Sequence, residues 1–152
     1  MTAIEAPDVP VSELHARLGI VVLEASAQRV VATMPVAGNT QPAGLLHGGA
    51  TAALAEGVGS IGALVHAGPG RSAVGIDLSV THHRAAREGT VTAVATPLHL
   101  GATVATYEVA VTDDAGRRTA TARLTCLVRT VRPDRPLYPD RPEATPAGPA
   151  AG

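Results

Sequence analysis

The chain has 152 residues, a formal net charge of −1 and a hydrophobic fraction of 45%. This length suits one domain with a real core, and the composition excludes a disordered chain or a coiled coil. The near-neutral charge and the lack of a dense basic run argue against nucleic-acid and membrane-surface partners.

The amino-terminal part predicts a short helix and a β-hairpin. The first ten residues, MTAIEAPDVP, have neither a basic start nor an apolar signal core, and with Cys126 as the lone cysteine they suit a cytoplasmic protein. Residues 11–18 form the predicted helix, with Ser12 as its cap and Gly19 at its end. Strands rich in Val and Ala at residues 20–24 and 29–35 form the hairpin.

One long helix is predicted over about residues 47–66, before the stop at Gly68-Pro69-Gly70. Its apolar stretch raises the alternative of a membrane helix, but Glu56 and two histidines interrupt it. The uninterrupted pieces are far shorter than the roughly 20 apolar residues that a span needs. The helix is rich in Ala and Gly, and because each Gly costs about 1 kcal/mol of helix propensity, these residues indicate close packing inside the fold.

Four strands are predicted after this helix, at residues 73–83, 89–98, 102–112 and 117–129, with a hairpin turn at 113–116. In the last strand apolar residues alternate with polar ones, so one side of the sheet is buried and should cover the helix. The predicted fold class is α+β, with a curved antiparallel sheet wrapped around one central helix. We expect this domain to span residues 1–132, followed by a flexible tail rich in Pro, Ala and Gly at 133–152.

The long helix starts with His47, Gly48 and Gly49. Backbone N–H groups in the first helical turn lack intrahelical partners and attract negative charge, and glycine lets a substrate carbonyl approach them closely. This pattern predicts an oxyanion hole, in which one donor is worth about 3 kcal/mol of the reaction barrier. The alternative is that the two glycines form only a turn.

Glu56 is the single carboxylate of this helix. An apolar setting disfavours the charged form and should raise the pKa of Glu56, which suits a base or a nucleophile. Ser60 lies one turn further along the same face, where its hydroxyl could orient Glu56 or a water molecule. The alternative is that Glu56 only reaches solvent at the helix surface.

The spacing of these groups predicts an assembly. Gly49 and Glu56 are seven residues apart, which separates them by roughly 10 Å along a helix axis. One reacting carbonyl cannot contact both groups, so a site that uses both must combine the helix start of one subunit with Glu56 of another. This predicts an obligate symmetric dimer.

Residues 41–60, QPAGLLHGGATAALAEGVGS, resemble the active-site helix of hotdog-fold thioesterases of the phenylacetate-degradation type. The likeness continues through VGIDLSVTHHRAAREG, TPLHLGA and DDAGRRTATARLTCLV and covers roughly residues 14–128. It is strongest to the branch of the enterobactin proofreading thioesterase and the dihydroxynaphthoyl-CoA thioesterase. The resemblance implies a hotdog fold and hydrolysis of an acyl or aroyl thioester, carried by CoA or by an acyl carrier protein, without a metal or prosthetic group.

The resemblance also implies roles for matching residues. Glu56 would be the nucleophile or general base, and the Gly48 amide with Gln41 would polarise the thioester carbonyl. His47 would lie beside the leaving thiolate, and Ser60 would hold the attacking water or the acyl group. Further substrate contacts are expected at His82 in the acyl pocket, at Arg84 and Arg87 near the phosphates of CoA or a phosphopantetheine arm, and at Gly49 and Gly101. We expect a homo-oligomer that shares its site between subunits, as a dimer of dimers.

Several details of the site stay open. A metal site formed by His47, His82 and His99 is conceivable, but their spacing matches no recognised ligand pattern, so no metal is expected. His82 and the adjacent His83 should face opposite sides of a strand, so at most one of them should line the site. Gly101 is followed by Ala102 where many relatives have Arg, and the loss of this phosphate contact keeps a carrier-bound substrate open.

Two other functions fit the sequence. A hotdog hydratase or dehydratase acting on acyl-CoA also uses a His and a carboxylate near the helix start. Here the acid lies nine residues after His47, which favours hydrolysis. A non-catalytic acyl-binding protein would keep the fold without turnover, and the intact set of Gln41, His47, Glu56 and Ser60 argues against it.

Overall fold

The order of helices and strands in the computed structural model, which describes residues 12–131, is the predicted one, and each boundary agrees within two residues. The elements are α1 (Glu13–Leu18), β1 (Val21–Ala25), β2 (Val30–Pro35), α2 (Gly48–Ala67), β3 (Arg71–His82), β4 (Thr90–Leu100), β5 (Val104–Thr112) and β6 (Arg118–Thr130). Ser12 caps α1 as predicted, and the tail predicted at 133–152 lies outside the described residues.

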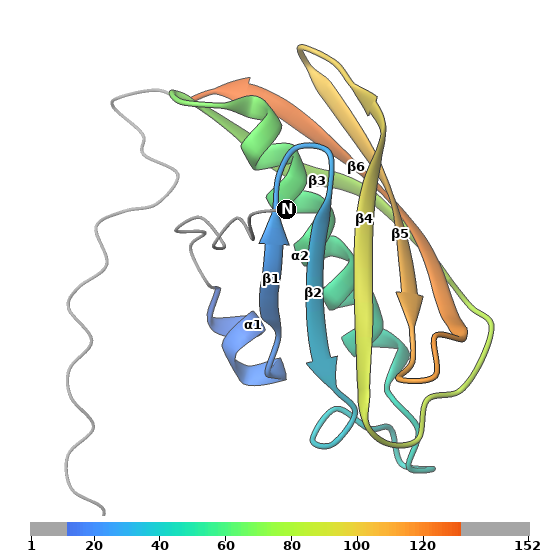
Figure 1. The fold of residues 1–152 in the computed structure, drawn as a ribbon. Coiled ribbons are helices and arrows are strands. Elements are labelled where there is room, and N and C mark those ends of the chain that lie inside the picture. Colours follow the sequence, from blue (N-terminus) through green and yellow to red (C-terminus); the bar gives the residue numbers. More distant parts are fainter. Residues whose placement is uncertain (1–11, 132–152) are drawn as a thin grey trace, which may run out of the picture.

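The six strands form one antiparallel sheet in the order β1-β2-β4-β5-β6-β3, and this sheet curves around α2 (Figure 1). The predicted α+β hotdog arrangement is therefore confirmed. β3 follows α2 in the chain yet pairs with β6 along its length, from Arg71 opposite Thr130 to His82 opposite Ala120. Among the described residues, β1 and β3 are the two edges of the sheet.

The buried face of the sheet covers α2, as the alternation in the last strand predicts. Leu124 and Cys126 are buried on β6, whereas Arg123, on the other face of this strand, is exposed. A β-carbon added to Gly59 would lie 2.7 Å from Leu124 Cδ2, and one added to Gly62 would lie 2.7 Å from Tyr107 Cε1. The glycines of α2 therefore allow the helix backbone to approach the sheet.

By length and composition alone α2 could cross a membrane, but 56% of its most apolar window is buried inside the fold. This degree of burial is that of a core helix, in agreement with the sequence-based interpretation.

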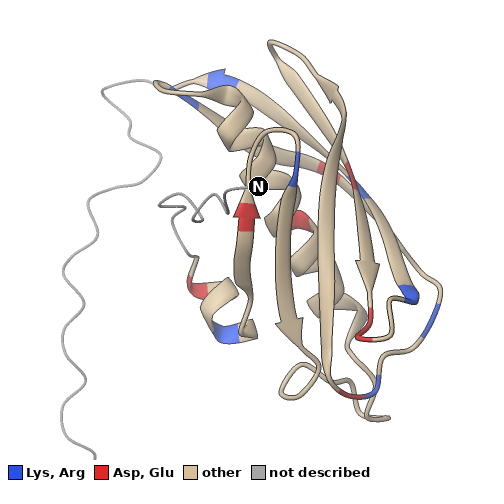
Figure 2. Ribbon diagram, viewed as in Figure 1, with Lys and Arg blue, Asp and Glu red and all other residues tan. Residues whose placement is uncertain are grey.

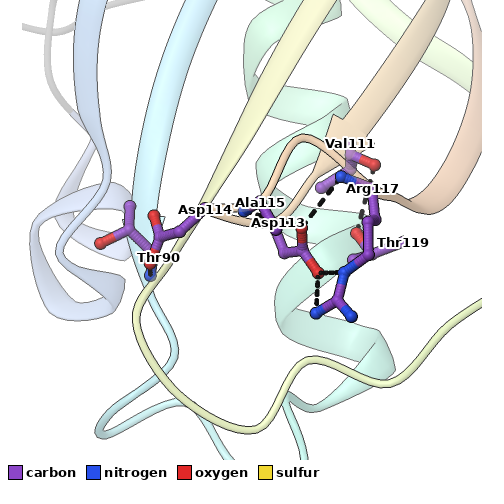
Figure 3. Close-up of polar contacts among 7 residues, drawn as sticks. All are labelled: Thr90, Val111, Asp113, Asp114, Ala115, Arg117 and Thr119. Carbon is purple, nitrogen blue, oxygen red and sulfur yellow. Dashed lines mark hydrogen bonds and ion pairs between the residues drawn. The ribbon is translucent and has the colours of Figure 1, made fainter.

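The turn between β5 and β6 is held by Asp113 (Figure 3). Its carboxylate accepts hydrogen bonds from the backbone N–H of Ala115 and Arg117 and from the Arg117 guanidinium, and this pairing with Arg117 lowers the pKa of Asp113. The neighbouring Asp114 accepts a 2.9 Å hydrogen bond from the backbone N–H of Thr90, which ties the same turn to the start of β4.

Candidate active site

The loop that leads into α2 is held by hydrogen bonds at Asn39 and at Leu46. The side-chain Nδ2 of Asn39 donates to the carbonyls of Leu18 and Pro35, at 2.8 Å each. The Asn39 carbonyl in turn accepts a 2.8 Å hydrogen bond from the backbone N–H of His47, and Leu46 donates to the carbonyl of Ala86. The start of α2 is therefore held directly by Asn39 and Ala86, and through Asn39 by Leu18 and Pro35.

The amides of this first turn are not equivalent. His47 is the N-cap, and its Nδ1 accepts a 2.8 Å hydrogen bond from the Gly49 N–H. Ala50 and Thr51 donate to the His47 carbonyl. Gly48 N–H has no acceptor among residues 12–131, so it is the amide left free for a substrate oxygen. The predicted oxyanion donor thus falls at Gly48, whereas the Gly49 amide is already occupied.

A cleft of about 360 Å³ opens at this helix start. A β-carbon on Gly48 would lie 3.0 Å from His82 Nε2, so the imidazole at the end of β3 packs against Gly48. Gln41 Oε1 accepts a hydrogen bond from Ala43 N–H, which leaves the Gln41 amide NH₂ able to donate. The residues predicted to polarise or contact the substrate that border this cleft are Gln41, Gly48, His82 and Arg84.

A second cleft, of about 350 Å³, contains Glu56 and Ser60 on one face of α2, as predicted. Figure 2 shows a single acidic segment on an otherwise uncharged α2. The prediction that apolar residues enclose Glu56 is wrong for the single chain, because the Glu56 side chain is exposed. The same cleft is lined by Ala53 and Leu64 of α2 and by Ala73 of the edge strand β3.

The carboxylate of Glu56 nevertheless has a defined neighbour. A β-carbon on Gly75 of β3 would lie 3.0 Å from Glu56 Oε1. Gly75 stands at a register shift between β3 and β6, where the strand is irregular. The carboxylate therefore lies over a part of the edge strand that carries no side chain.

The two clefts have no lining residue in common. One contains the free helix-start amide, and the other contains the acid with its neighbouring hydroxyl. In a single chain the group predicted to polarise the substrate and the group predicted to react thus line different clefts, in agreement with the separation predicted from their spacing.

A sequence profile described as the thioesterase superfamily matches residues 43–120. The chain belongs to the thioesterase superfamily. It is 45% identical over 112 residues to the proofreading thioesterase EntH of Cronobacter sakazakii, a match that covers 73% of this chain and 82% of the relative. A Deinococcus radiodurans protein whose name proposes an esterase is 50% identical over 116 residues, covering 76% of this chain and 73% of that protein.

Solved structures agree with this membership. A thioesterase from Haemophilus influenzae superposes with a TM-score of 0.74 at 35% identity, covering 76% of this chain and 82% of that chain. A mutant thioesterase from Pseudomonas aeruginosa gives a TM-score of 0.75 at 35% identity, covering 78% and 86%. The protein is accordingly a thioester hydrolase, which favours hydrolysis over the hydratase and the non-catalytic alternatives.

Some residues predicted for the site lie elsewhere in this thioesterase. Gly101 is at the far end of α2, where its carbonyl oxygen lies 2.9 Å from His66 Nε2. Arg87 is exposed and borders neither cleft. The residues from 12 to 131 contain no group of three or more His, Cys, Asp or Glu side chains that could hold a metal ion.

The expectation that only one of the paired histidines lines the site is wrong. β3 ends at His82, so the strand alternation no longer applies to His83, and both residues border the helix-start cleft. Their rings still diverge. His82 lies against Gly48, whereas His83 Nε2 is 3.0 Å from Thr121 Oγ1.

Three contributors to the thioesterase clefts were missed from the sequence. His15 of α1 borders the Glu56 cleft, and Gly75 lies under the Glu56 carboxylate. Burial raises the pKa of the Cys126 thiol, while a hydrogen bond with Ser60 acts in the opposite direction, so this thiol stands behind Ser60. The alternation of β6 already placed Cys126 on the buried face, but the other two contacts join distant segments and leave no local signal.

Proposed function

We propose that this thioesterase hydrolyses acyl or aroyl thioesters with Glu56 as the nucleophile or general base. The observation that carries the proposal is the separation of two half-sites on one helix. A free Gly48 amide lies in one cleft, and the Glu56 carboxylate lies with Ser60 in the other.

In this proposal, the Gly48 N–H and the Gln41 NH₂ donate hydrogen bonds to the thioester carbonyl oxygen and stabilise the oxyanion that forms there. Glu56 either attacks the carbonyl carbon, giving a mixed anhydride that water then cleaves, or removes a proton from the attacking water. In both cases the carbon–sulfur bond breaks, and a carboxylic acid and a thiol result. Because His47 Nδ1 accepts a hydrogen bond from the Gly49 N–H, His47 Nε2 carries a hydrogen and can donate a hydrogen bond to the leaving thiolate. The proton that converts the thiolate to a thiol comes from the water consumed in the reaction.

The edge strand β3 suggests how the two half-sites meet. Gly75 lies beside Glu56 and His82 lies beside Gly48, so one strand borders both halves of the site. Their separation of seven residues corresponds to about 23 Å along a strand. If β3 pairs antiparallel with β3 of a second copy, around a two-fold axis between these positions, the Glu56 half of each subunit meets the Gly48 half of the other.

The substrate is proposed to be an acyl-CoA or an acyl group on a carrier protein. Arg84 is exposed at the border of the helix-start cleft, where its guanidinium can pair with a phosphate. The chemistry proposed needs no metal or prosthetic group, because the chain itself supplies the amide donors and the carboxylate. The whole assembly is proposed to be a dimer of dimers.

Replacement of Glu56 tests the reaction. We expect Glu56→Ala to lower kcat for benzoyl-CoA hydrolysis by at least about a hundredfold, the usual contribution of a general base. Because Glu56 is exposed, the variant should unfold at the same temperature as the wild type. Glu108→Ala, an exposed acid on β5 outside both clefts, is the matched control and should keep full activity. Near-normal hydrolysis by Glu56→Ala would sink the assignment.

A further inference from the structure

Gln41 occupies the first position of a tight turn in the loop before α2. Its carbonyl accepts a 2.9 Å hydrogen bond from the Gly44 N–H, and its own N–H donates to the Leu45 carbonyl at 2.8 Å. Pro42 at the second position fixes its own φ near the value that such a turn needs, and Gly44 takes a φ of 76° in the left-handed region. The backbone of Gln41 is therefore held by both of its polar groups.

The side-chain amide of Gln41 has two orientations to choose between. Its Oε1 only accepts hydrogen bonds and its Nε2 only donates them, and a half-turn about the last side-chain bond exchanges the two atoms. In the structure Oε1 accepts a 2.6 Å hydrogen bond from the backbone N–H of Ala43. In the exchanged orientation two donors, Nε2 and the Ala43 N–H, would face each other. The Ala43 N–H therefore selects the orientation that leaves the NH₂ group free.

The two orientations act oppositely on a substrate oxygen that carries developing negative charge. A free NH₂ group on Gln41 adds a second donor to the Gly48 N–H, whereas a free Oε1 would present an acceptor that repels the same oxygen. Within residues 12–131, the hydrogen bond from Ala43 is the one bond that the Gln41 amide makes. The choice between the two orientations therefore depends on a single backbone group.

We infer that the backbone N–H of Ala43 is a positioning group for the reaction, which holds the Gln41 amide with its NH₂ toward the oxyanion. This inference rests on the proposed function, in which Gln41 polarises the thioester carbonyl. The role belongs to the backbone of residue 43 and not to its methyl group, which is exposed. A larger side chain at this position should therefore leave the rate unchanged, whereas removal of the N–H should lower it.

An amide-to-ester substitution at residue 43 of the full-length protein tests the role, because lactic acid in place of Ala43 removes the N–H and keeps the methyl group. We expect kcat for benzoyl-CoA hydrolysis to fall about twofold to tenfold, the fold-change of one hydrogen bond. KM should change little, since an oxyanion donor acts in the transition state. The corresponding ester at Leu45 is the matched control, because the Leu45 N–H donates no hydrogen bond within residues 12–131, and it should keep the wild-type kcat. Ala43→Leu, which retains the N–H, should also keep it.

The same ester in a Gln41→Ala background separates positioning from general damage to the loop. With no amide left to orient, the ester at residue 43 should not lower kcat any further. An equal drop in both backgrounds would mean that the ester disturbs the start of α2 directly, and an unchanged kcat in the otherwise wild-type chain would mean that the N–H does not matter; either result overturns the inference and leaves the proposed function standing. Failure of the proposed function has a different signature, because Gln41→Ala by itself would then keep the wild-type kcat.

Discussion

At the scale of single residues, the missing side chain of Gly75 leaves room for the Glu56 carboxylate. The Glu56 carboxylate occupies the volume that a β-carbon on Gly75 would approach at 3.0 Å. A methyl group there would push the carboxylate aside, and because Glu56 is exposed and long, it can move without disturbing the core.

We therefore expect Gly75→Ala to lower kcat by about tenfold to a hundredfold, the size of effect that a displacement near 1 Å produces. KM and the melting temperature should change little. Steady-state kinetics measure kcat and KM, and a thermal melt measures the melting temperature. Val74→Ala, whose side chain is exposed on the neighbouring position of β3, is the control and should keep the wild-type kcat. An unchanged kcat in Gly75→Ala would mean that this space does not position the carboxylate.

The residue scale also shows where prediction from the sequence stops. Glu56 could be identified from the sequence as a candidate site residue because it is the only acid in an apolar helix. The helix start at Gly48 could be identified because two glycines follow the N-cap. The surroundings of Glu56 could not be predicted, since whether a helical position faces the sheet or a cleft depends on tertiary packing. His15 reaches the same cleft from a separate helix, and no spacing along the chain records that contact.

At the scale of elements, α2 and β5 meet where Gly62 faces the ring of Tyr107. A β-carbon on Gly62 would lie 2.7 Å from Tyr107 Cε1 and 3.0 Å from its hydroxyl, and Tyr107 is fully buried. We expect Gly62→Ala to destabilise the protein by about 1–3 kcal/mol through overpacking, although alanine is the better helix former. Denaturant unfolding measures the change. In a Tyr107→Leu background the same substitution should cost less; a stabilised single variant would refute the close contact.

Tyr107 also ties β5 to the turn between β1 and β2, because its hydroxyl donates to the Ala27 carbonyl at 2.8 Å. Burial raises the pKa of Tyr107 from 10 to about 12. Below pH 10 the phenol is protonated in both states, and above pH 10 it ionises first in the unfolded chain, so the free energy of unfolding should fall between pH 10 and 12.

Replacement of this hydroxyl isolates its part of the alkaline response. Tyr107→Phe should lose about 1 kcal/mol of stability at neutral pH, where the hydrogen bond is intact. It should also show a shallower fall in stability above pH 10, measured by denaturant unfolding across pH. Some fall should remain, since burial also raises the pKa of the Cys126 thiol. An identical alkaline slope in the variant would contradict the assignment to Tyr107.

The same elements show why the fold was more predictable than the site. Capping residues, turn sequences and alternating or Val-rich segments are local signals, and the boundaries predicted from them agree with the structure within two residues. The pairing of β3 with β6 on the far side of the sheet joins distant segments, and so does the register shift at Gly75. These long-range features position both clefts, and local patterns do not contain them.

At the scale of the whole molecule, the two proposed half-sites of each chain line different clefts. Among residues 12–131, β3 is an edge strand that borders both halves, and a second copy can pair with such an edge. In the symmetric dimer proposed above, each complete site takes Glu56 from one subunit and Gln41 with Gly48 from the other. The activity of a dimer that carries two inactivating mutations should therefore depend on whether both mutations lie in the same subunit or in different subunits.

Mixing two inactive variants tests this arrangement. Hybrids of Glu56→Ala with Gln41→Ala have one doubly altered site and one intact site. Since random exchange makes half of the dimers hybrid, an equal mixture should recover about a quarter of wild-type activity. Glu56→Ala mixed with Ser60→Ala is the control, because both changes fall in the same half-site and no hybrid contains an intact site, so activity should stay at the level of the separate variants. No recovery in the first mixture, once subunit exchange has been verified by mass spectrometry, would place the whole site within one chain.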